Sequence, residues 1–192
     1  MRTEIKTLFP TEVMFGSFNE ELVTPVAQEL LSNLDFSSGG DVSDISLLGN
    51  EHNLPELKKF FNNYVVEKFN EYTEKLFDHK LNINKCKFKA WSVNGASDYN
   101  LGFHNHSGAQ LSAVFYFLVE HSNRTGGKIR FHDPRFNANR GMTEPFKFRH
   151  DDVEFLPRTG DFVIFPSYLY HSVSPFNGNI RLILPVDMFM DA

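Results

Sequence analysis

Residues 103–119 read FHNHSGAQLSAVFYFLV, and this stretch decides the fold that we expect for the chain. Its second part, Leu111–Val119, is apolar, aromatic and β-branched, which is typical of a buried strand, and the Ser107-Gly108 pair before it is a turn signal. Side chains two residues apart on a strand point to the same side. His104 and His106 can therefore present two imidazoles to one point beside a sheet.

Working outward, two helical segments precede this stretch and further short strands follow it. The first helix is expected from a cap at Asn19 or Ser17 to about Leu34, and the second from near Asn53, with Pro55 in its first turn. The strand-like runs are Phe88–Ala90, Leu111–Val119, Gly127–Phe131, Phe146–Phe148, Asp161–Phe165 and Ile180–Met188. Many short strands behind two helices predict an α+β or mainly β fold, a sandwich or barrel flanked by helices.

The composition limits the domain organisation and the kind of metal site. The 192 residues fit a single domain, 1–192, in which residues 1–80 form a mostly helical support and residues 83–190 form the β core. The 21 Phe residues are expected mainly in helix–sheet and sheet–sheet contacts. A single cysteine, Cys86, excludes an internal disulfide and a thiolate-rich zinc site, so a bound metal would take its ligands from His, Asp or Glu.

The charge distribution argues against a nucleic-acid-binding protein. The net charge is −5, although residues 121–150 hold seven Lys or Arg and only two acids. We favour a solvated loop face for this basic stretch, and the alternative is a rim that attracts an anionic substrate. No apolar run resembles a signal peptide or a membrane span, so the expected location is the cytoplasm and no membrane partner is expected.

Two later residues add to the chemistry of the His104-Asn105-His106 stretch. His171 follows a strand-and-turn pattern, and Arg181 lies ten residues further on, directly before an apolar run. A lone histidine is usually a hydrogen-bonded structural residue, and an arginine that opens a strand is usually a surface cation. An inward-pointing arginine, however, needs an anion, because an unpaired buried charge costs several kcal/mol. A ligand carboxylate would meet that need by bidentate bonding.

The combined spacing is more specific than its parts and resembles the iron(II)- and 2-oxoglutarate-dependent dioxygenases, in particular a subgroup of oxygenases from bacteria and their viruses. The resemblance covers about residues 88–188. It rests on Trp91, Asn94, the HxH pair with the strand after it, Gly127–Arg135, Pro157–Pro166, and His171 through Arg181. It implies a double-stranded β-helix, a jelly-roll or cupin-like barrel, with helices packed on the larger sheet. It also implies a bacterial cell, or a host cell infected by a phage, as the location.

The resemblance further implies a metal site, with one departure from the family pattern. His104 and His171 match the two histidines of the family's iron-binding triad, and His106 stands where most members have Asp or Glu. A third neutral histidine keeps the facial geometry but leaves the site one negative charge short. We favour His106 as a ligand. The alternative is that Asp98 or Asp133 supplies a carboxylate and that His106 lies behind the ligands.

The same resemblance implies the cosubstrate site and the reaction. Arg181 would pair with the far carboxylate of 2-oxoglutarate, and Tyr116 would add a hydroxyl. Arg135 and Asn94 are candidates for the substrate rim. The expected reaction is hydroxylation of a small molecule or a protein side chain by dioxygen, with release of succinate and CO₂. Neither the substrate nor the oligomeric state follows from the sequence.

Two other functions compete with this hypothesis. A cupin-like metal protein, either an isomerase or a dioxygenase that needs no cosubstrate, would also use HxH and a later His. Cupins usually add a Glu shortly after HxH, where this chain has Gln110, and they give Arg181 no required role. The third possibility is a non-catalytic jelly roll in which the three histidines are incidental.

Overall fold

The computed structural model describes residues 4, 10–36, 41–42, 46–78, 80–82, 85–122, 126–135 and 152–190. The helices are α1 (Glu20–Asn33), α2 (Pro55–Phe60), η1 (Phe61–Val65, a π-helical turn) and α3 (Val66–Phe77). The strands are β1 (Met14–Ser17), β2 (Asp41–Val42), β3 (Cys86–Ala90), β4 (Ser92–Asn94), β5 (Leu101–His104), β6 (Leu111–His121), β7 (Ile129–Phe131), β8 (Val153–Phe155), β9 (Asp161–Pro166), β10 (His171–Val173) and β11 (Gly178–Met190).

Both expected helices form, and local chemistry accounts for their ends. The side chain of Asn19 accepts the N–H of Glu21 and caps α1, whose first turn carries two glutamates that favour the positive end of the helix dipole. The second helix begins at Pro55, as predicted, and runs on as α2, η1 and α3. The π turn within it was not predicted, because one extra residue in a turn changes the apolar spacing only slightly.

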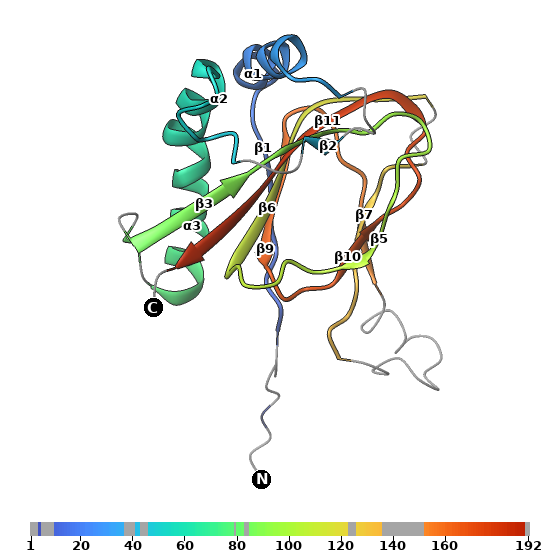
Figure 1. Ribbon diagram of the computed structural model, residues 1–192. Helices are drawn as coiled ribbons and strands as arrows, with labels where there is room; N and C mark the ends of the chain where they lie inside the picture. Colours follow the sequence, from blue (N-terminus) through green and yellow to red (C-terminus); the bar gives the residue numbers. More distant parts are fainter. Residues whose placement is uncertain are drawn as a thin grey trace.

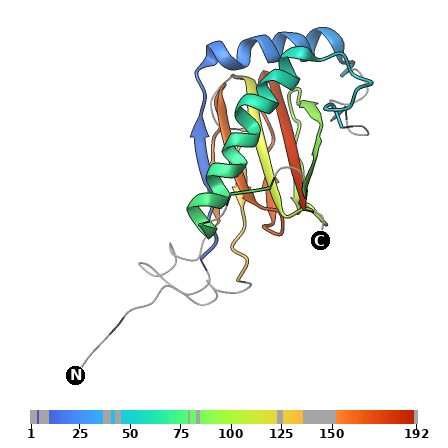
Figure 2. The same ribbon diagram turned by 90° about the vertical axis from the view of Figure 1, so that its left-hand side faces the viewer.

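The strands form two antiparallel sheets. The larger sheet has the order β1-β9-β6-β11-β4-β2, with β3 pairing to β11, and the smaller has the order β5-β10-β7-β8. In Figures 1 and 2 the helices lie on one face of the larger sheet, and the smaller sheet lies across its other face. The described fold is thus a mixture of helices and two antiparallel sheets, as the sequence predicted, with the helices on the larger sheet.

Two apolar clusters hold these layers together. One lies between the helices and the larger sheet and includes Leu30, Phe69 and Phe117, and the other lies between the two sheets and includes Phe131 and Phe165. Most of the described Phe rings lie in or against these clusters, as expected from the sequence. Figure 2 shows the long α2–α3 segment crossing the strands of the larger sheet, which places the first cluster beneath it.

The alternation of side chains along β11 connects the core to the space between the sheets. Leu182, Leu184 and Val186 belong to the cluster beneath the helices, whereas Ile183 belongs to the cluster between the sheets. Since the strand period is two, Arg181 and Asp187 face the same inter-sheet side as Ile183. A strand buried on both faces therefore carries two ionisable residues on its inner face.

Some expected elements differ or lie outside the described residues. The strand that the sequence suggested near His171 forms as β10, which begins at that residue. The short strands β1, β2 and β8 were not predicted, because two to four residues are too few for a clear alternation. The predicted strand Phe146–Phe148 lies outside the described residues. No helix of the described chain is long and apolar enough to cross a membrane.

Candidate functional site

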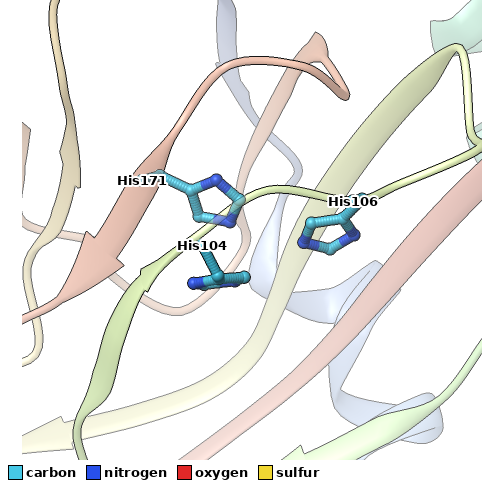
Figure 3. Close-up of side chains that lie close together, drawn as sticks. All are labelled: His104, His106 and His171. Carbon is cyan, nitrogen blue, oxygen red and sulfur yellow. The ribbon is translucent and has the colours of Figure 1, made fainter.

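Three imidazoles meet where the smaller sheet approaches β6 and β11. His104 ends β5 and lies opposite His171, the first residue of β10, in the antiparallel register. His106 lies two residues beyond β5, and its backbone N–H donates to the carbonyl of Ser167 at 3.0 Å. One nitrogen from each ring lies within 4.8 Å of one from each of the others, and Figure 3 shows the three rings turned toward a common point.

The second nitrogen of each ring is already hydrogen-bonded. The Nδ1 of His104 lies 2.7 Å from the Gly102 carbonyl, and the Nδ1 of His171 lies 3.0 Å from the Leu169 carbonyl. Carbonyl oxygens only accept, so these two Nδ1 atoms carry hydrogen and leave the Nε2 lone pairs unshared. Such outer hydrogen bonds are typical of histidines that bind a metal through Nε2.

The Nδ1 of His106 is hydrogen-bonded to the carboxylate of Asp187 instead of to a backbone carbonyl. The Asp187 Oδ1 lies 2.6 Å from the Nδ1 of His106 and also accepts the hydroxyl of Ser112 at 2.7 Å. The Ser112 hydroxyl is in turn 2.8 Å from that of Ser167. All three imidazoles can therefore offer Nε2 to one cation.

Burial keeps two of these rings neutral, which is the form that binds a metal. Desolvation lowers the pKa of His171 to about 3, and it also lowers the pKa of His104. His171 is 3% exposed. A cluster of neutral imidazoles with oriented Nε2 atoms is suited to a first-row divalent metal.

A pocket between the sheets leads from the imidazoles to Arg181. It is lined from the larger sheet by Val114, Tyr116, Ile183 and Arg181, and from the smaller sheet by His104 and His171, among others. Arg181 is 1% exposed, and the Nε and Nη1 of its guanidinium have no hydrogen-bond partner among the described residues. The arginine therefore points inward, as the sequence suggested.

Aromatic rings surround this cation. The Arg181 guanidinium lies 5.9 Å from the ring of Tyr99 and 5.4 Å from the ring of Tyr116. The buried Tyr116 hydroxyl also has no partner in the described chain. Burial raises the pKa of this hydroxyl, and the nearby Arg181 charge opposes that shift. The pocket thus presents a cation and a neutral hydroxyl, both able to donate to an anion.

The other predicted site residues are placed differently. Asn94 is on β4, opposite Leu182, and Arg135 bonds Asp133 through its side chain and through its backbone N–H. Neither Asn94 nor Arg135 lines the pocket. The bond from the Arg135 N–H to the Asp133 side chain, two residues earlier, is typical of a turn. Neither Asp98 nor Asp133 belongs to the metal-binding cluster found among the described residues.

The described part of the basic stretch is locally neutralised. Lys128 and Arg130 both pair with Glu154, which lowers the pKa of that carboxyl, and Arg135 pairs with Asp133. These pairs favour the solvated-face interpretation over an anion-attracting rim. Residues Arg124, Arg140, Lys147 and Arg149 lie outside the described residues.

The sequence interpretation missed some residues of the site. Asp187 and Tyr99 were not identified, although a lone acid inside the apolar run of β11 was a usable signal for Asp187. Outside the site, His52 and His121 are only partly exposed, and each has a buried ring nitrogen. The ring of His121 packs against Phe176, which explains its partial burial.

Comparison with solved structures identifies proteins of the same fold. The chain is similar to a Pseudomonas putida prolyl-4-hydroxylase (13% identity, TM-score 0.62, 94% of this chain and 93% of that one). It is also similar to HygX from Streptomyces hygroscopicus, solved with nickel and 2-oxoglutarate bound (12% identity, TM-score 0.62, 94% and 82%). A third similar structure is an oxidoreductase of the 2OG-Fe(II) oxygenase family from Burkholderia pseudomallei (15% identity, TM-score 0.50). The alignment covers 71% of this chain and 59% of that protein. At these identities the likeness shows the fold alone.

Sequence comparison gives the family. No curated protein sequence matches the chain. The family described as "Putative 2OG-Fe(II) oxygenase" matches residues 89–187, slightly more than half of the chain, and this range includes the three histidines, Tyr116 and Arg181. The chain therefore belongs to this family of 2OG-Fe(II) oxygenases, and its cofactors are the Fe(II) and 2-oxoglutarate that the sequence led us to expect.

Proposed function

We propose that the protein is an Fe(II)- and 2-oxoglutarate-dependent hydroxylase. The Nε2 atoms of His104, His106 and His171 would hold the iron, and Arg181 with Tyr116 would bind the far carboxylate of 2-oxoglutarate. The observation that carries this proposal is the buried guanidinium of Arg181, which has two unpartnered donors in the same pocket as three convergent imidazoles. A dicarboxylate that reaches both groups accounts for the two features together.

The residues present fit these two groups. Each imidazole has its Nδ1 bonded to an oxygen, so three Nε2 lone pairs are available to one cation. At Arg181, Nε and Nη1 are unpartnered donors on a buried cation, so the guanidinium has hydrogen bonds available for a carboxylate. When bound, the iron and 2-oxoglutarate supply the oxidising chemistry, in which dioxygen is consumed and succinate and CO₂ are released.

The protein's own residues bind, orient and keep water away. Val114, Ile129 and Ile183 form apolar walls between the imidazoles and Arg181, which favours a dry pocket. The ring of Trp91 lies 5.9 Å from that of His106 at an interplanar angle of 32°, so it covers one side of the metal-binding cluster. These contacts hold the ligand nitrogens in place before any cofactor arrives.

The same observations weigh against the cupin-like alternative. A cupin-like function gives Arg181 no required role, so it does not explain why this cation is buried without an anion. A cupin-like protein would also place a side chain near Gln110 on the metal, but the Oε1 of Gln110 instead accepts the backbone N–H of Met190 at 2.7 Å. Gln110 is therefore occupied at the far end of β11.

The finer assignments are part of this proposal. We assign the two facing sheets as a double-stranded β-helix, supported by the antiparallel order of both sheets and by the similar folds. An oxygenase of this family uses dioxygen and an organic substrate, which we take to be a small molecule or a protein side chain. A single domain, a cytoplasmic location and a bacterial or phage origin stay predictions from the sequence.

An anaerobic binding experiment tests the function. Fe(II) and then 2-oxoglutarate are added to the purified protein, and we expect a visible charge-transfer band that needs both. The band should vanish in His171→Ala, whereas Glu154→Gln, which alters an ion pair on the outer side of β8, should keep it. Absence of iron binding by the parent protein would exclude the proposed function. Succinate release on admission of oxygen is the accompanying activity measurement.

A further inference from the structure

We propose that Asp187 is a positioning residue for the metal, and that it supplies from behind His106 the negative charge that a directly bound carboxylate would otherwise bring. This inference rests on the proposed function, because it takes His106 to be a ligand. It assigns a role to a residue that belongs neither to the imidazole cluster nor to the pocket lining.

The contact between Asp187 and His106 is specific and built from several elements. Asp187 lies on β11 opposite Ser112 of β6, is 8% exposed, and bonds the His106 ring at 2.6 Å. The Ser112 hydroxyl donates to the same carboxylate and contacts Ser167. Because the carbonyl of Ser167 accepts the backbone N–H of His106, a closed ring of hydrogen bonds holds this histidine at both its main chain and its imidazole.

The three histidines differ in what stands behind them. Backbone carbonyls, which carry no net charge, accept from His104 and His171. Only His106 has a carboxylate behind it, and His106 is also the position where the resemblance to the oxygenases places an acidic ligand. The negative charge that a carboxylate ligand would bring is thus absent from the three imidazoles themselves. It is present on the carboxylate of Asp187, which is bonded to the imidazole of His106.

The surroundings of Asp187 also require a nearby positive charge. Among ion pairs between described residues, its sole partner is His106, and no Lys or Arg pairs with it. A buried carboxylate without a cation is unfavourable, since burial penalises an uncompensated charge. A divalent cation bound to the opposite nitrogen of His106 provides the compensating charge without any rearrangement of the protein.

Asp187→Asn separates charge from shape. The amide oxygen can still accept from His106 and Ser112, so the geometry is kept while the charge is removed. We expect the affinity of the metal-free protein for Co(II), followed by its visible d–d absorption, to fall about 10–100-fold, the range seen when a partner behind a ligand is lost. The charge-transfer band of the Fe(II)–2-oxoglutarate complex should also shift. The matched control is Glu154→Gln, which removes a paired carboxylate outside the site and should bind Co(II) like the parent.

A second background makes the test independent of simple structural damage. In His106→Asp the ligand carries its own charge, so the carboxylate of Asp187 becomes a repulsive neighbour. Asp187→Asn should therefore weaken Co(II) binding in the parent but tighten it in the His106→Asp protein, a reversal of sign that a general loss of packing cannot produce. If Asp187→Asn alone does not fold, the Co(II) affinities of His106→Asp and of the double variant His106→Asp/Asp187→Asn are compared instead. Tighter binding by the double variant supports the role of Asp187, and weaker binding contradicts it.

The outcomes distinguish this inference from the proposed function. Metal binding by the parent with no change in Asp187→Asn, or an equal loss in both backgrounds, overturns the role of Asp187 and leaves the oxygenase proposal intact. Failure of the parent to bind Co(II) or Fe(II) overturns both. Circular dichroism of each metal-free variant shows that the compared proteins are folded.

Discussion

Replacing Arg181 with Met removes a buried charge while filling much of the same space. Arg181 is 1% exposed, and its Nε and Nη1 are unpartnered among the described residues. The rings of Tyr99 and Tyr116 lie close to its charge. Truncating a buried cation that has a protein partner costs about 3–5 kcal/mol. Here no anion is left behind, and the lost ring contacts are worth about 0.5–2 kcal/mol each, offset by removal of the unpaired charge. We therefore expect the free energy of unfolding of the metal-free protein to change by no more than about 1 kcal/mol.

The effect on cosubstrate binding should be much larger. Two hydrogen bonds from a cation to a carboxylate contribute about 1.5–3 kcal/mol each. A combined loss of about 3–6 kcal/mol corresponds to a roughly 10²–10⁴-fold rise in the Kd for 2-oxoglutarate. Arg181→Met should thus separate stability from ligand binding, with little change in the first and a large loss in the second.

The assay compares two ligands that differ only at the far end. The parent and the Arg181→Met variant, each loaded with Fe(II), are titrated anaerobically with 2-oxoglutarate and with 2-oxopentanoate, in which a methyl group replaces the far carboxylate. The four affinities form a thermodynamic cycle. The parent should prefer 2-oxoglutarate, and the variant should bind both ligands with similar, weak affinity. A variant that keeps the parent's preference for 2-oxoglutarate would refute the assignment of Arg181 to the far carboxylate.

Three further predictions concern stability, each measured by urea unfolding of the metal-free protein. Glu29→Ala should lower the free energy of unfolding by about 1–3 kcal/mol. The Glu29 carboxylate accepts the backbone N–H groups of Glu56 and Leu57, in the first turn of α2, at 3.0 and 2.8 Å. An unchanged free energy of unfolding would contradict this capping role. Gly160→Ala should lower the free energy of unfolding by about 1–3 kcal/mol, because φ is +87° and an added Cβ would lie 2.5 Å from the Phe18 carbonyl oxygen. The control is Gly102→Ala, where an added Cβ meets open space, and it should lower the free energy of unfolding clearly less. Burial lowers the pKa of His171 to about 3 in the folded protein, against about 6.5 in the unfolded chain. Between these two pH values the unfolded chain binds a proton that the folded protein does not bind. The free energy of unfolding should therefore fall as the pH drops from about 6.5 toward 3. Between about pH 7 and pH 5 that slope should be smaller in His171→Gln, and equal slopes would show that His171 is not the group responsible.

Local signals in the sequence predicted the helices and the approximate places of the longer strands. Asn19 caps α1 through its own side chain, and Pro55 opens α2, so both helix starts depend on residues close by in the chain. The pairing partners of the strands depend on contacts between distant segments. The placement of β11 between β6 and both β3 and β4 therefore could not be read from the chain.

The candidate site shows the same division. The HxH spacing, the later His171 and the arginine ten residues beyond it were visible as a pattern, and the structure brings these side chains to one pocket. The rim residues had no comparable pattern. Arg135 pairs with Asp133 beside it, and the pairing of β4 with β11 sets the position of Asn94.

By itself, the sequence determined which ligand chemistry is available. It has eight histidines and one cysteine, and the spacing of three histidines and an arginine resembles that of an oxygenase family. Only the tertiary structure decided that Asp187, 81 residues beyond His106, stands behind that ring, and that Arg181 is buried without a hydrogen-bond partner for Nε and Nη1 among the described residues. The physical reason is the range of the interactions. Caps, turns and side-chain periodicity act over a few residues, whereas the register of β11 against β6 and the packing of one sheet on the other set the surroundings of each buried charge.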